Sequence, residues 1–285
     1  MPDRFKAACI QFCAVPEIAP NLDTSLRLIR EAAAAGAKLI SLPEYFSGLA
    51  AEGGRLIPTA FREEVHPAIP TLGQTARELG VFILLGSLAV VRADGKTVNR
   101  AYLIDPSGSI AARYDKIHLF DVDLEPGKDY RESEIIAPGN LAVVADTPWG
   151  GLGLSVCYDV RFPHLYRELA KGGAMMLAVP AAFTRLTGRA HWHVLIRARA
   201  IENGAFVLAA CQNGTLRGGG ECFGHSLIVD PWGEILADAG EDEGFIVADI
   251  DPGAVVAARR RIPALAHDRP FAVLAADAPR RVASA

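Results

Sequence analysis

Short apolar runs alternate with amphipathic helical patterns along most of this chain, and no other feature restricts its fold as strongly. The apolar run Phe5–Phe12 predicts a strand, and Asn21–Ala35 predicts a helix because apolar residues recur there every three or four positions. Gly36 follows at the position where helices commonly end. Strands that alternate with helices bury themselves against helical layers, so the pattern predicts an α/β fold.

The alternation continues to about residue 250, and only residues 115–140 interrupt it with an irregular polar segment. Long loops of this kind tend to be functional. Further helices are expected at Thr71–Leu79, Phe162–Ala170 and Trp192–Glu202. Further strands are expected at Lys38–Leu42, Val81–Val90, Val98–Ile104, Ile110–Arg113, Leu141–Ala145, Leu152–Val156, Ala174–Val179, Phe206–Cys211, Phe245–Ile250 and in a hairpin over Ser226–Ala237.

An internal repeat suggests that the fold consists of two similar halves. The segment Ile104–Ile110 contains Asp-Pro-Ser-Gly, and Val229–Ile235 contains Asp-Pro-Trp-Gly, each inside a predicted hairpin. The alternative, that both are simply favourable turns, stays open. No linker divides the chain, so we expect one domain over residues 1–285, with a C-terminal tail from about residue 252. Two packed sheets with helices on their outer faces would satisfy the rules for packing layers.

Charge and composition exclude several classes of protein. The 29 Lys and Arg residues against 33 Asp and Glu give a net charge of −4 without a dense basic block, which argues against a nucleic-acid partner. The longest apolar stretch, Gly172–Phe183, is too short to span a membrane, and the N-terminus does not resemble a signal peptide. Five cysteines without a paired motif indicate a reducing, cytoplasmic location.

Cys157 stands at the end of the predicted strand Leu152–Val156, a few residues before a predicted helix. A thiol that faces a helix N-terminus is expected to be accessible and to have a lowered pKa. The alternative is a buried structural cysteine, which the charged neighbours Asp159 and Arg161 do not suit. We expect those two residues to form an ion pair beneath the turn.

Glu44, Lys116 and Glu132 are three further candidates for chemistry. Glu44 follows the predicted strand Lys38–Leu42 among aromatic residues, which would desolvate the carboxylate and make it a better base. Lys116 opens the irregular segment, where its ammonium group could stabilise an oxyanion. Taken singly, Glu44 could be an ordinary loop carboxylate and Lys116 a solvated cation, and Glu132 alone indicates nothing.

Two other patterns carry weaker signals. His191-x-His193 resembles a pair of metal ligands, but alternate residues of a helix do not share a face and no set of carboxylates lies nearby in the sequence. We therefore expect no metal site. The segment Arg217–Gly220 lacks the Lys and Ser or Thr of a phosphate-binding loop, so we expect a flexible turn.

Five motifs of the sequence occur together in this order. They are LPEYFSG (42–48), YDKIHLFDVD (114–123), SVCYDVRFP (155–163), TGRAHWHVLIRARAIEN (187–203) and GHSLIVDPWGE (224–234). With these motifs the chain resembles the nitrilase superfamily of carbon–nitrogen hydrolases, from about Phe5 to about Pro263. The turn after Cys157 continues with Tyr-Asp, which is similar to the amidases of this superfamily. The predicted helix in the fourth motif is similar to the Nit branch, which includes ω-amidase and deaminated-glutathione amidase.

The resemblance implies a mechanism and a fold. Cys157 would be the nucleophile, Glu44 the general base, Lys116 the catalytic lysine and Glu132 the second glutamate, with Lys116 and the backbone N–H of Tyr158 holding the oxyanion. It also implies an α-β-β-α sandwich that pairs into a homodimer or a larger homo-oligomer. Amide hydrolysis through a thioester needs no metal and no organic cofactor.

The substrate is expected to be a small linear primary amide that carries a carboxylate, of the deaminated-glutathione type. Arg185, Arg189 or Arg217 could bind that carboxylate, because an unpaired buried charge is costly. The glycine-rich stretch Thr215–Glu221 departs from what the branch leads us to expect and leaves the substrate less defined. An N-carbamoyl amino acid amidohydrolase, a nitrilase, a catalytically silent interaction protein and a thiol redox sensor centred on Cys157 stay open as alternatives.

Overall fold

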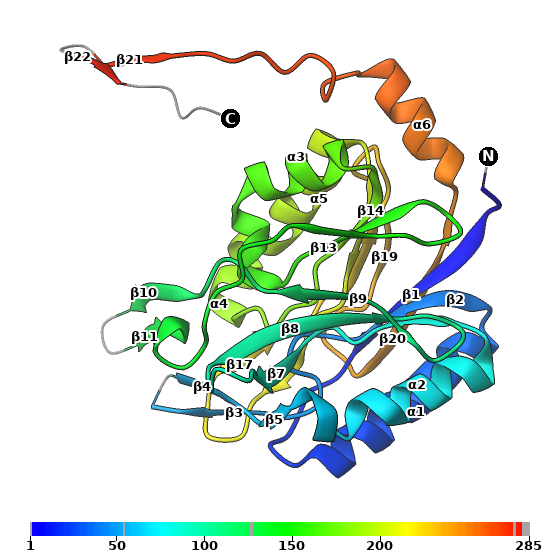
Figure 1. Cartoon of the computed structure of the whole chain (residues 1–285), viewed down its shortest axis with the longest axis vertical. Coiled ribbons are helices and arrows are strands. Elements are labelled where there is room, and N and C mark those ends of the chain that lie inside the picture. The colour runs from blue at the N-terminus through cyan, green and yellow to red at the C-terminus, as the bar shows by residue number, and fades with distance from the viewer. Residues whose placement is uncertain (1, 54, 126–127, 276–277, 281–285) are drawn as a thin grey trace.

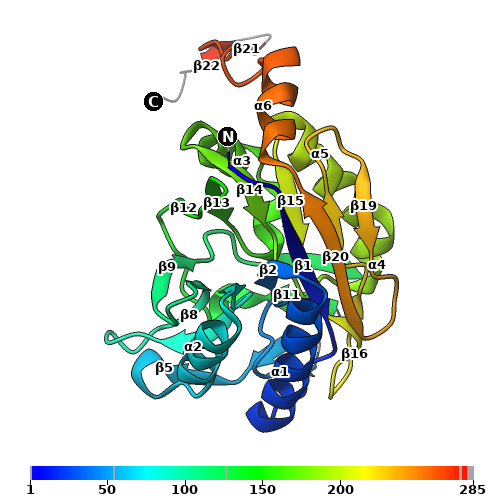
Figure 2. The same ribbon diagram turned by 90° about the vertical axis from the view of Figure 1, so that its right-hand side faces the viewer.

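Two β-sheets packed face to face form the centre of the protein in the computed structural model, which describes residues 2–53, 55–125, 128–275 and 278–280 (Figures 1 and 2). The first sheet has the order β20 (Gly244–Ile250), β1 (Phe5–Gln11), β2 (Ala37–Ser41), β6 (Phe82–Leu84), β8 (Thr97–Ile104), β7 (Leu88–Val91) and β5 (Ala60–Arg62), with β9 (Ile110–Asp115) also paired to β8. The second sheet has the order β12 (Val143–Ala145), β13 (Gly151–Leu154), β14 (Ala174–Ala178), β15 (Phe206–Ala209), β18 (Leu227–Val229) and β19 (Ile235–Asp238).

Helices cover the outer face of each sheet. Helices α1 (Ile18–Ala34) and α2 (Ala68–Leu79) pack on the first sheet, and α3 (Pro163–Lys171) and α5 (His193–Asn203) pack on the second, as Figure 2 shows. The predicted α-β-β-α sandwich is therefore confirmed. Among the described residues, no helix is both long enough and apolar enough to cross a bilayer.

Strand β1 shows why this sequence forms a buried layer. Ala7 and Cys9 join the apolar cluster between the two sheets, whereas Ala8 and Ile10 join the cluster beneath α1 and α2. Successive side chains of a strand point to opposite faces, so a strand covered on both sides must be apolar at nearly every position. The continuous apolar runs of the sequence follow from this requirement.

The two halves of the chain repeat one topology. In the first sheet β1, β2 and β6 are parallel, β20 is antiparallel at one side, and the β8–β9 hairpin follows at the other. In the second sheet β13, β14 and β15 are parallel, β12 is antiparallel at one side, and the β18–β19 hairpin follows at the other. Asp105 and Asp230 begin the equivalent hairpin turns. The internal repeat therefore reflects two similar halves.

The predicted strand Val81–Val90 is wrong as a single element, because Gly86 divides it into β6 and β7. Gly86 has φ +33°, and a Cβ atom there would lie 2.0 Å from the carbonyl oxygen of Pro43. The backbone approaches the loop after β2 so closely that only glycine fits. The break also places Ser87 beneath Tyr45, whose N–H donates to the Ser87 hydroxyl at 3.1 Å.

Short hairpins near one end of the molecule were not expected from the sequence. They are β3 (Leu49–Glu52) with β4 (Arg55–Pro58), β10 (Asp121–Glu125) with β11 (Lys128–Arg131), and β16 (Asn213–Thr215) with β17 (Glu221–Phe223). The second of these and the 3₁₀-helix η2 (Glu132–Glu134) order the segment expected to be irregular. Figure 1 shows β4, β11 and β17 at the same end of the fold.

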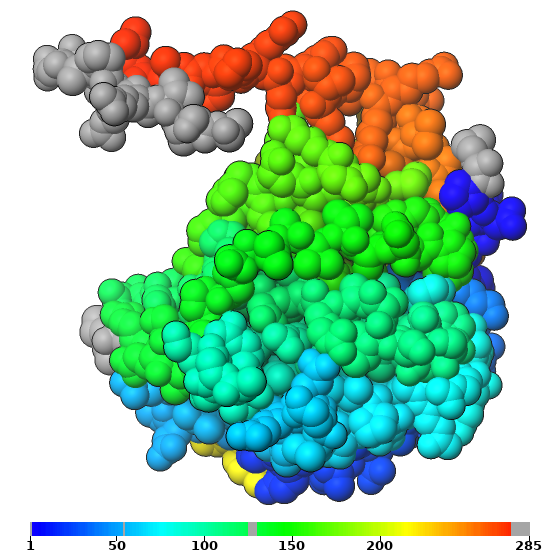
Figure 3. Space-filling view, in the orientation of Figure 1, coloured from blue at the N-terminus to red at the C-terminus, as the bar shows by residue number. Residues whose placement is uncertain are grey.

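Beyond residue 251 the chain forms helix α6 (Pro252–Arg261), where a C-terminal tail was expected to begin. The Asp251 side chain accepts a hydrogen bond from the N–H of Gly253 and caps this helix, while Val255 is buried in the same apolar cluster as Ala7 and Cys9. The segment after α6 extends beyond the body of the molecule and contains the paired strands β21 (Val273–Ala275) and β22 (Ala278–Arg280) (Figures 1 and 3).

Candidate active site

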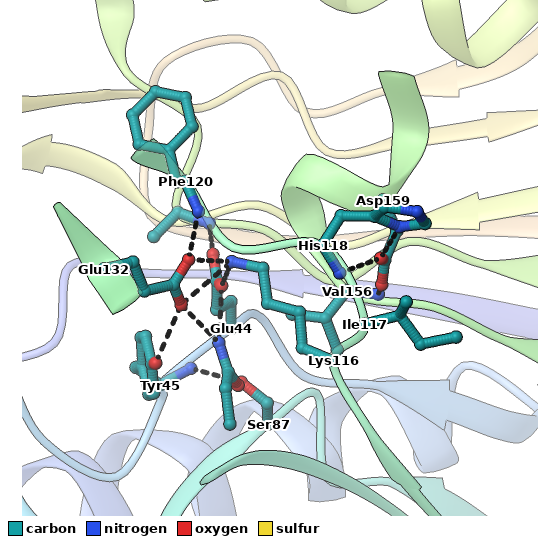
Figure 4. A network of polar contacts seen from close by, with 12 residues as sticks. Glu44, Tyr45, Ser87, Lys116, Ile117, His118, Phe120, Glu132, Val156 and Asp159 are labelled. Carbon is teal, nitrogen blue, oxygen red and sulfur yellow. Dashed lines mark hydrogen bonds and ion pairs between the residues drawn. The ribbon is translucent and has the colours of Figure 1, made fainter. Parts of the chain in front are cut away.

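A buried lysine lies between two carboxylates where the loops after β2, β9 and β11 converge (Figure 4). Lys116 Nζ is 3.0 Å from Glu44 Oε1 and 2.8 Å from Glu132 Oε2. The Lys116 and Glu44 side chains are each only 2% exposed. The structure therefore brings together three of the residues that the sequence singled out.

The electrostatics of this cluster keep Lys116 charged. Burial alone lowers the pKa of a lysine, but the carboxylates of Glu132 and Glu44 outweigh it and hold the pKa of Lys116 well above its usual range. One cation faces two carboxylates, so further hydrogen-bond donors are needed to satisfy the carboxylate oxygens. A buried ion pair is tolerable only when its remaining lone pairs are satisfied.

Neighbouring groups supply those donors. Asn99 Nδ2 donates to Glu44 Oε1 at 2.8 Å, and the N–H of Ala182 donates to Glu44 Oε2 at 2.8 Å. The N–H of Phe120 donates to Glu132 Oε2 at 2.7 Å. Each carboxylate is thus fixed by both backbone and side-chain groups, which leaves it little freedom to rotate.

Cys157 begins the 3₁₀-helix η3 (Cys157–Arg161) directly after β13 and has φ +48°, which is unusual for a residue with a side chain. Its N–H donates to the carbonyl oxygen of Pro180 at 2.8 Å, which holds the turn. A sharp turn between a strand and a helix presents a side chain at the edge of the sheet, as in the nucleophile elbows of hydrolases. Glu44 and Cys157 line the same cavity, and the charge of the Glu44 carboxylate acts on the pKa of the thiol.

The expected lowering of the Cys157 pKa is wrong. Burial and the negative charge of Glu44 raise the pKa of the thiol well above its usual range, and Lys116 offsets only part of this effect. The residue is also only 8% exposed, so the thiol is not freely accessible. Near neutral pH Cys157 is therefore a neutral thiol next to a proton acceptor.

The expected ion pair between Asp159 and Arg161 is also wrong. Asp159 is buried and accepts a hydrogen bond from the Tyr114 hydroxyl at 2.7 Å. It also accepts one from the N–H of His118 at 3.0 Å (Figure 4). Arg161 instead lies over the ring of Phe183, with 5.3 Å from Cζ to the ring centroid. Asp159 holds the Cys157 turn against the loop that carries Lys116, because its carboxylate bonds both segments.

A cavity of about 110 Å³ opens onto these groups. Glu44, Lys116, Glu132, Cys157 and Tyr158 all line it. Its remaining walls are mostly apolar and come from β4, from the β10–β11 hairpin and from the loop that leads to β17. A pocket with apolar walls and a few fixed polar groups is the usual form of a small-molecule site.

Comparison with known proteins identifies this arrangement. A sequence profile of the family described as carbon-nitrogen hydrolase matches residues 6–260. The chain belongs to the carbon–nitrogen hydrolase family. Deaminated glutathione amidase of Synechocystis sp. is 42% identical over 268 residues, which cover 92% of this chain and 97% of that protein. Omega-amidase NIT2 of Xenopus tropicalis is 37% identical over 261 residues, covering 91% and 93% respectively.

The fold agrees with this assignment. The NitFhit protein of C. elegans superposes with a TM-score of 0.85 at 34% identity, covering 94% of this chain and 66% of that chain. The resemblance to the Nit branch of the nitrilase superfamily is confirmed, and the protein is a carbon–nitrogen hydrolase.

The structure of this carbon–nitrogen hydrolase changes the candidates for binding a substrate carboxylate. Arg185 pairs with Glu241 and Arg217 pairs with Glu17 at the surface, and neither they nor Arg189 are among the described residues that line the cavity. The glycine-rich stretch does border the cavity, through Leu216, Gly220 and Glu221.

Two arginines that the sequence did not single out, Arg55 and Arg131, line the cavity instead. Arg131 Nη1 donates to the backbone oxygens of Val122 and Tyr130, so it belongs to the β10–β11 hairpin. Arg55 lies on β4 and pairs with Glu134 at 2.9 Å. Asn99 was also missed, because an Asn inside a strand gives no signal until tertiary contacts place it between Glu44 and Glu132.

We predict that alkylation of Cys157 by iodoacetamide keeps accelerating as the pH rises through 9, because its raised pKa leaves little thiolate below that pH. In Glu44→Gln, the profile shifts to lower pH because the neighbouring negative charge is gone. Peptide mapping by mass spectrometry measures the rate at Cys157 alone. A rate that levels off below pH 7 in the unmodified protein would contradict this assignment.

Proposed function

We propose that this enzyme hydrolyses a small, linear, carboxylate-bearing primary amide to an acid and ammonia, with Cys157 as nucleophile, in the manner of a deaminated-glutathione amidase. The observation that supports it best is Lys116 held between Glu44 and Glu132 in the cavity that Cys157 also lines. The names of the Synechocystis and Xenopus relatives support an amide substrate.

The first half of the reaction forms a thioester. Glu44 takes the proton of the Cys157 thiol, and the thiolate attacks the amide carbonyl carbon. The resulting oxyanion is stabilised by the Lys116 ammonium group and by the N–H of Tyr158, which lies in the first turn of η3, where helical N–H groups have no partner within the helix. Because the pKa of Lys116 is raised, it stays charged and stabilises the oxyanion without giving up its proton.

Glu44 then returns its proton to the leaving nitrogen, so that ammonia departs and the acyl group remains on Cys157 as the thioester. In the second half Glu44 takes a proton from water, whose oxygen attacks the thioester carbonyl carbon. The C–S bond breaks, the acid leaves, and Glu44 returns the proton to the Cys157 sulfur, which re-forms the thiol. Glu132 acts as a positioning residue, because both of its oxygens lie within 3.0 Å of Lys116 Nζ.

We assign the substrate carboxylate to Arg55. Its guanidinium group lies on the β4 wall of the cavity, and its present partner, Glu134, also lines that cavity. Both side chains are about half exposed, so exchanging one carboxylate partner for another costs little. A planar guanidinium also suits two-point binding of a carboxylate.

The cysteines favour a cytoplasmic location. All five are free thiols, as a reducing compartment would keep them.

Exposed apolar side chains favour a homodimer. Large apolar side chains are exposed on α5 and on the adjoining turn, at Val194, Ile201 and Trp232. Such exposure is typical of a surface that a second copy of the chain covers.

We predict that Cys157→Ala abolishes amide hydrolysis, and that Glu44→Gln and Lys116→Ala each lower kcat at least about 1000-fold. The Glu44→Gln, Lys116→Ala double variant loses little more than the worse single one, because the residues act as a unit. Ammonia release measures turnover, and thermal unfolding shows that each variant is folded.

The matched control for these variants is Cys13→Ala, because Cys13 is a half-buried thiol outside the cavity lining and should leave turnover unchanged. Full activity in Cys157→Ala would refute the nucleophile. If the unmodified protein releases no ammonia from any amide, the result would support the alternative of a catalytically silent interaction protein. Reversible disulfide formation at Cys157 would support the alternative of a thiol redox sensor.

We predict that Arg55→Met raises KM for a carboxylate-bearing amide at least about tenfold with a smaller effect on kcat, because the contact is equally strong in ground and transition states. The control is Arg217→Met, since Arg217 pairs with Glu17 away from the cavity lining. Steady-state kinetics are measured on this amide and on the same amide with its carboxylate blocked as an uncharged methyl ester. The comparison shows whether the change in KM depends on the substrate carboxylate. Equal kcat/KM for both amides in the unmodified enzyme, or a preference for nitriles or N-carbamoyl amino acids, would overturn the substrate class.

A further inference from the structure

Two histidines and one aspartate meet on the second half of the fold, away from the cavity lining. His193 begins α5, His225 precedes β18, and Asp238 ends β19. His193 Nε2 lies 3.0 Å from Asp238 Oδ2, and His225 Nδ1 lies 2.9 Å from Asp238 Oδ1. One ligand atom from each residue lies within 4.8 Å of the other two, a spacing that can hold a metal ion.

The surrounding backbone fixes these side chains before any ligand binds. His225 has φ +52°, a conformation that side chains rarely adopt, and its N–H donates to the carbonyl oxygen of Gly240 at 2.6 Å. Its ring stacks on Phe223 with centroids 4.5 Å apart and meets the ring of His193 edge-on at 5.1 Å. The N–H of Gly240 in turn donates to Asp238 Oδ1 at 2.9 Å.

We propose that His193, His225 and Asp238 bind one divalent transition-metal ion of the zinc type. Two imidazole nitrogens and a carboxylate oxygen form a donor set that such ions prefer, with water in the remaining position. Tetrahedral zinc with bonds of about 2.0–2.1 Å places its ligand atoms roughly 3.3 Å apart. Asp238 Oδ2 lies 3.0 Å from His193 Nε2 and 3.2 Å from His225 Nδ1, which is already close to this, and the two imidazole nitrogens need to approach by about 1.5 Å at most.

The exposure of the three residues suits an open site. Their side chains are 33%, 23% and 32% exposed, so an ion can enter and keep a water ligand. His191, the other histidine of the H-x-H pattern, lies beside Arg161 instead, with Arg161 Nη1 3.3 Å from His191 Nδ1. The H-x-H pattern therefore contributes only His193 to the proposed site, and His225 and Asp238 come from distant parts of the chain.

The bound ion would have a structural role, because it would tie α5 and the two strands of the β18–β19 hairpin together. Trp192 Nε1 donates to the carbonyl oxygen of His225 at 2.7 Å, and the Trp192 ring packs on Phe183 with centroids 4.9 Å apart. Phe183 lines the catalytic cavity. The ion would thus stiffen the support behind one cavity wall while amide hydrolysis proceeds at Cys157.

The test is titration of the full-length, chelator-treated protein with Zn²⁺ by calorimetry, together with the absorption spectrum of the Co²⁺-loaded protein. We expect one equivalent to bind, a Co²⁺ spectrum of nitrogen and oxygen ligands without a thiolate band, and a Tm rise of about 5 °C at 100 times the Kd. His193→Gln and Asp238→Asn should each weaken binding at least about 100-fold. His225→Asn should do the same while keeping a residue that tolerates its backbone conformation.

The matched control is His191→Gln, which removes a nearby exposed histidine and should leave zinc affinity unchanged. Failure to bind, or equal affinity in His193→Gln and the unmodified protein, would overturn the proposal. A thiolate band that disappears in Cys157→Ala would place the ion at the nucleophile and would also overturn it. Chelator should leave ammonia release unchanged, so this test and the test of amide hydrolysis fail independently.

Discussion

The buried contact of Lys116 with Glu44 and Glu132 is the interaction on which the rest of the site depends. Removing three charges from water is costly, and only mutual pairing together with donors such as Asn99 makes the cluster tolerable. Two carboxylates against one cation leave an excess of negative charge, which helps to keep the neighbouring Cys157 thiol neutral. The site is consequently arranged for proton transfer to a carboxylate. A stable thiolate at Cys157 would instead need an excess of positively charged neighbours.

The sandwich of two similar halves explains how these groups meet. Glu44 and Lys116 follow strands of the first sheet, Cys157 follows a strand of the second, and the N–H of Ala182 from the second half donates to Glu44. Strands that pack face to face bring their loops together at one end. The site therefore exists only when both halves are folded and docked, because neither half carries Cys157 and Glu44 together.

The sequence predicted the elements whose periodicity is long enough to identify. It singled out Glu44, Lys116 and Cys157 because they follow predicted strands within motifs that resemble a family, whereas Glu132 was a candidate only through the resemblance. It did not predict the division at Gly86, because a close backbone approach leaves no local pattern. It also misjudged the pKa of Cys157, since burial and the proximity of Glu44 are tertiary properties. For the same reason Arg55 was missed, because side-chain direction and the short strand β4 are fixed by packing.

Intact-protein mass spectrometry during turnover of a carboxylate-bearing primary amide tests the central claim most directly. We expect a covalent species heavier than the free enzyme by the acyl group, without the amide nitrogen, and peptide mapping should place the acyl group on Cys157. An adduct on another residue, or turnover without any adduct in Cys157→Ala, would contradict the proposed mechanism.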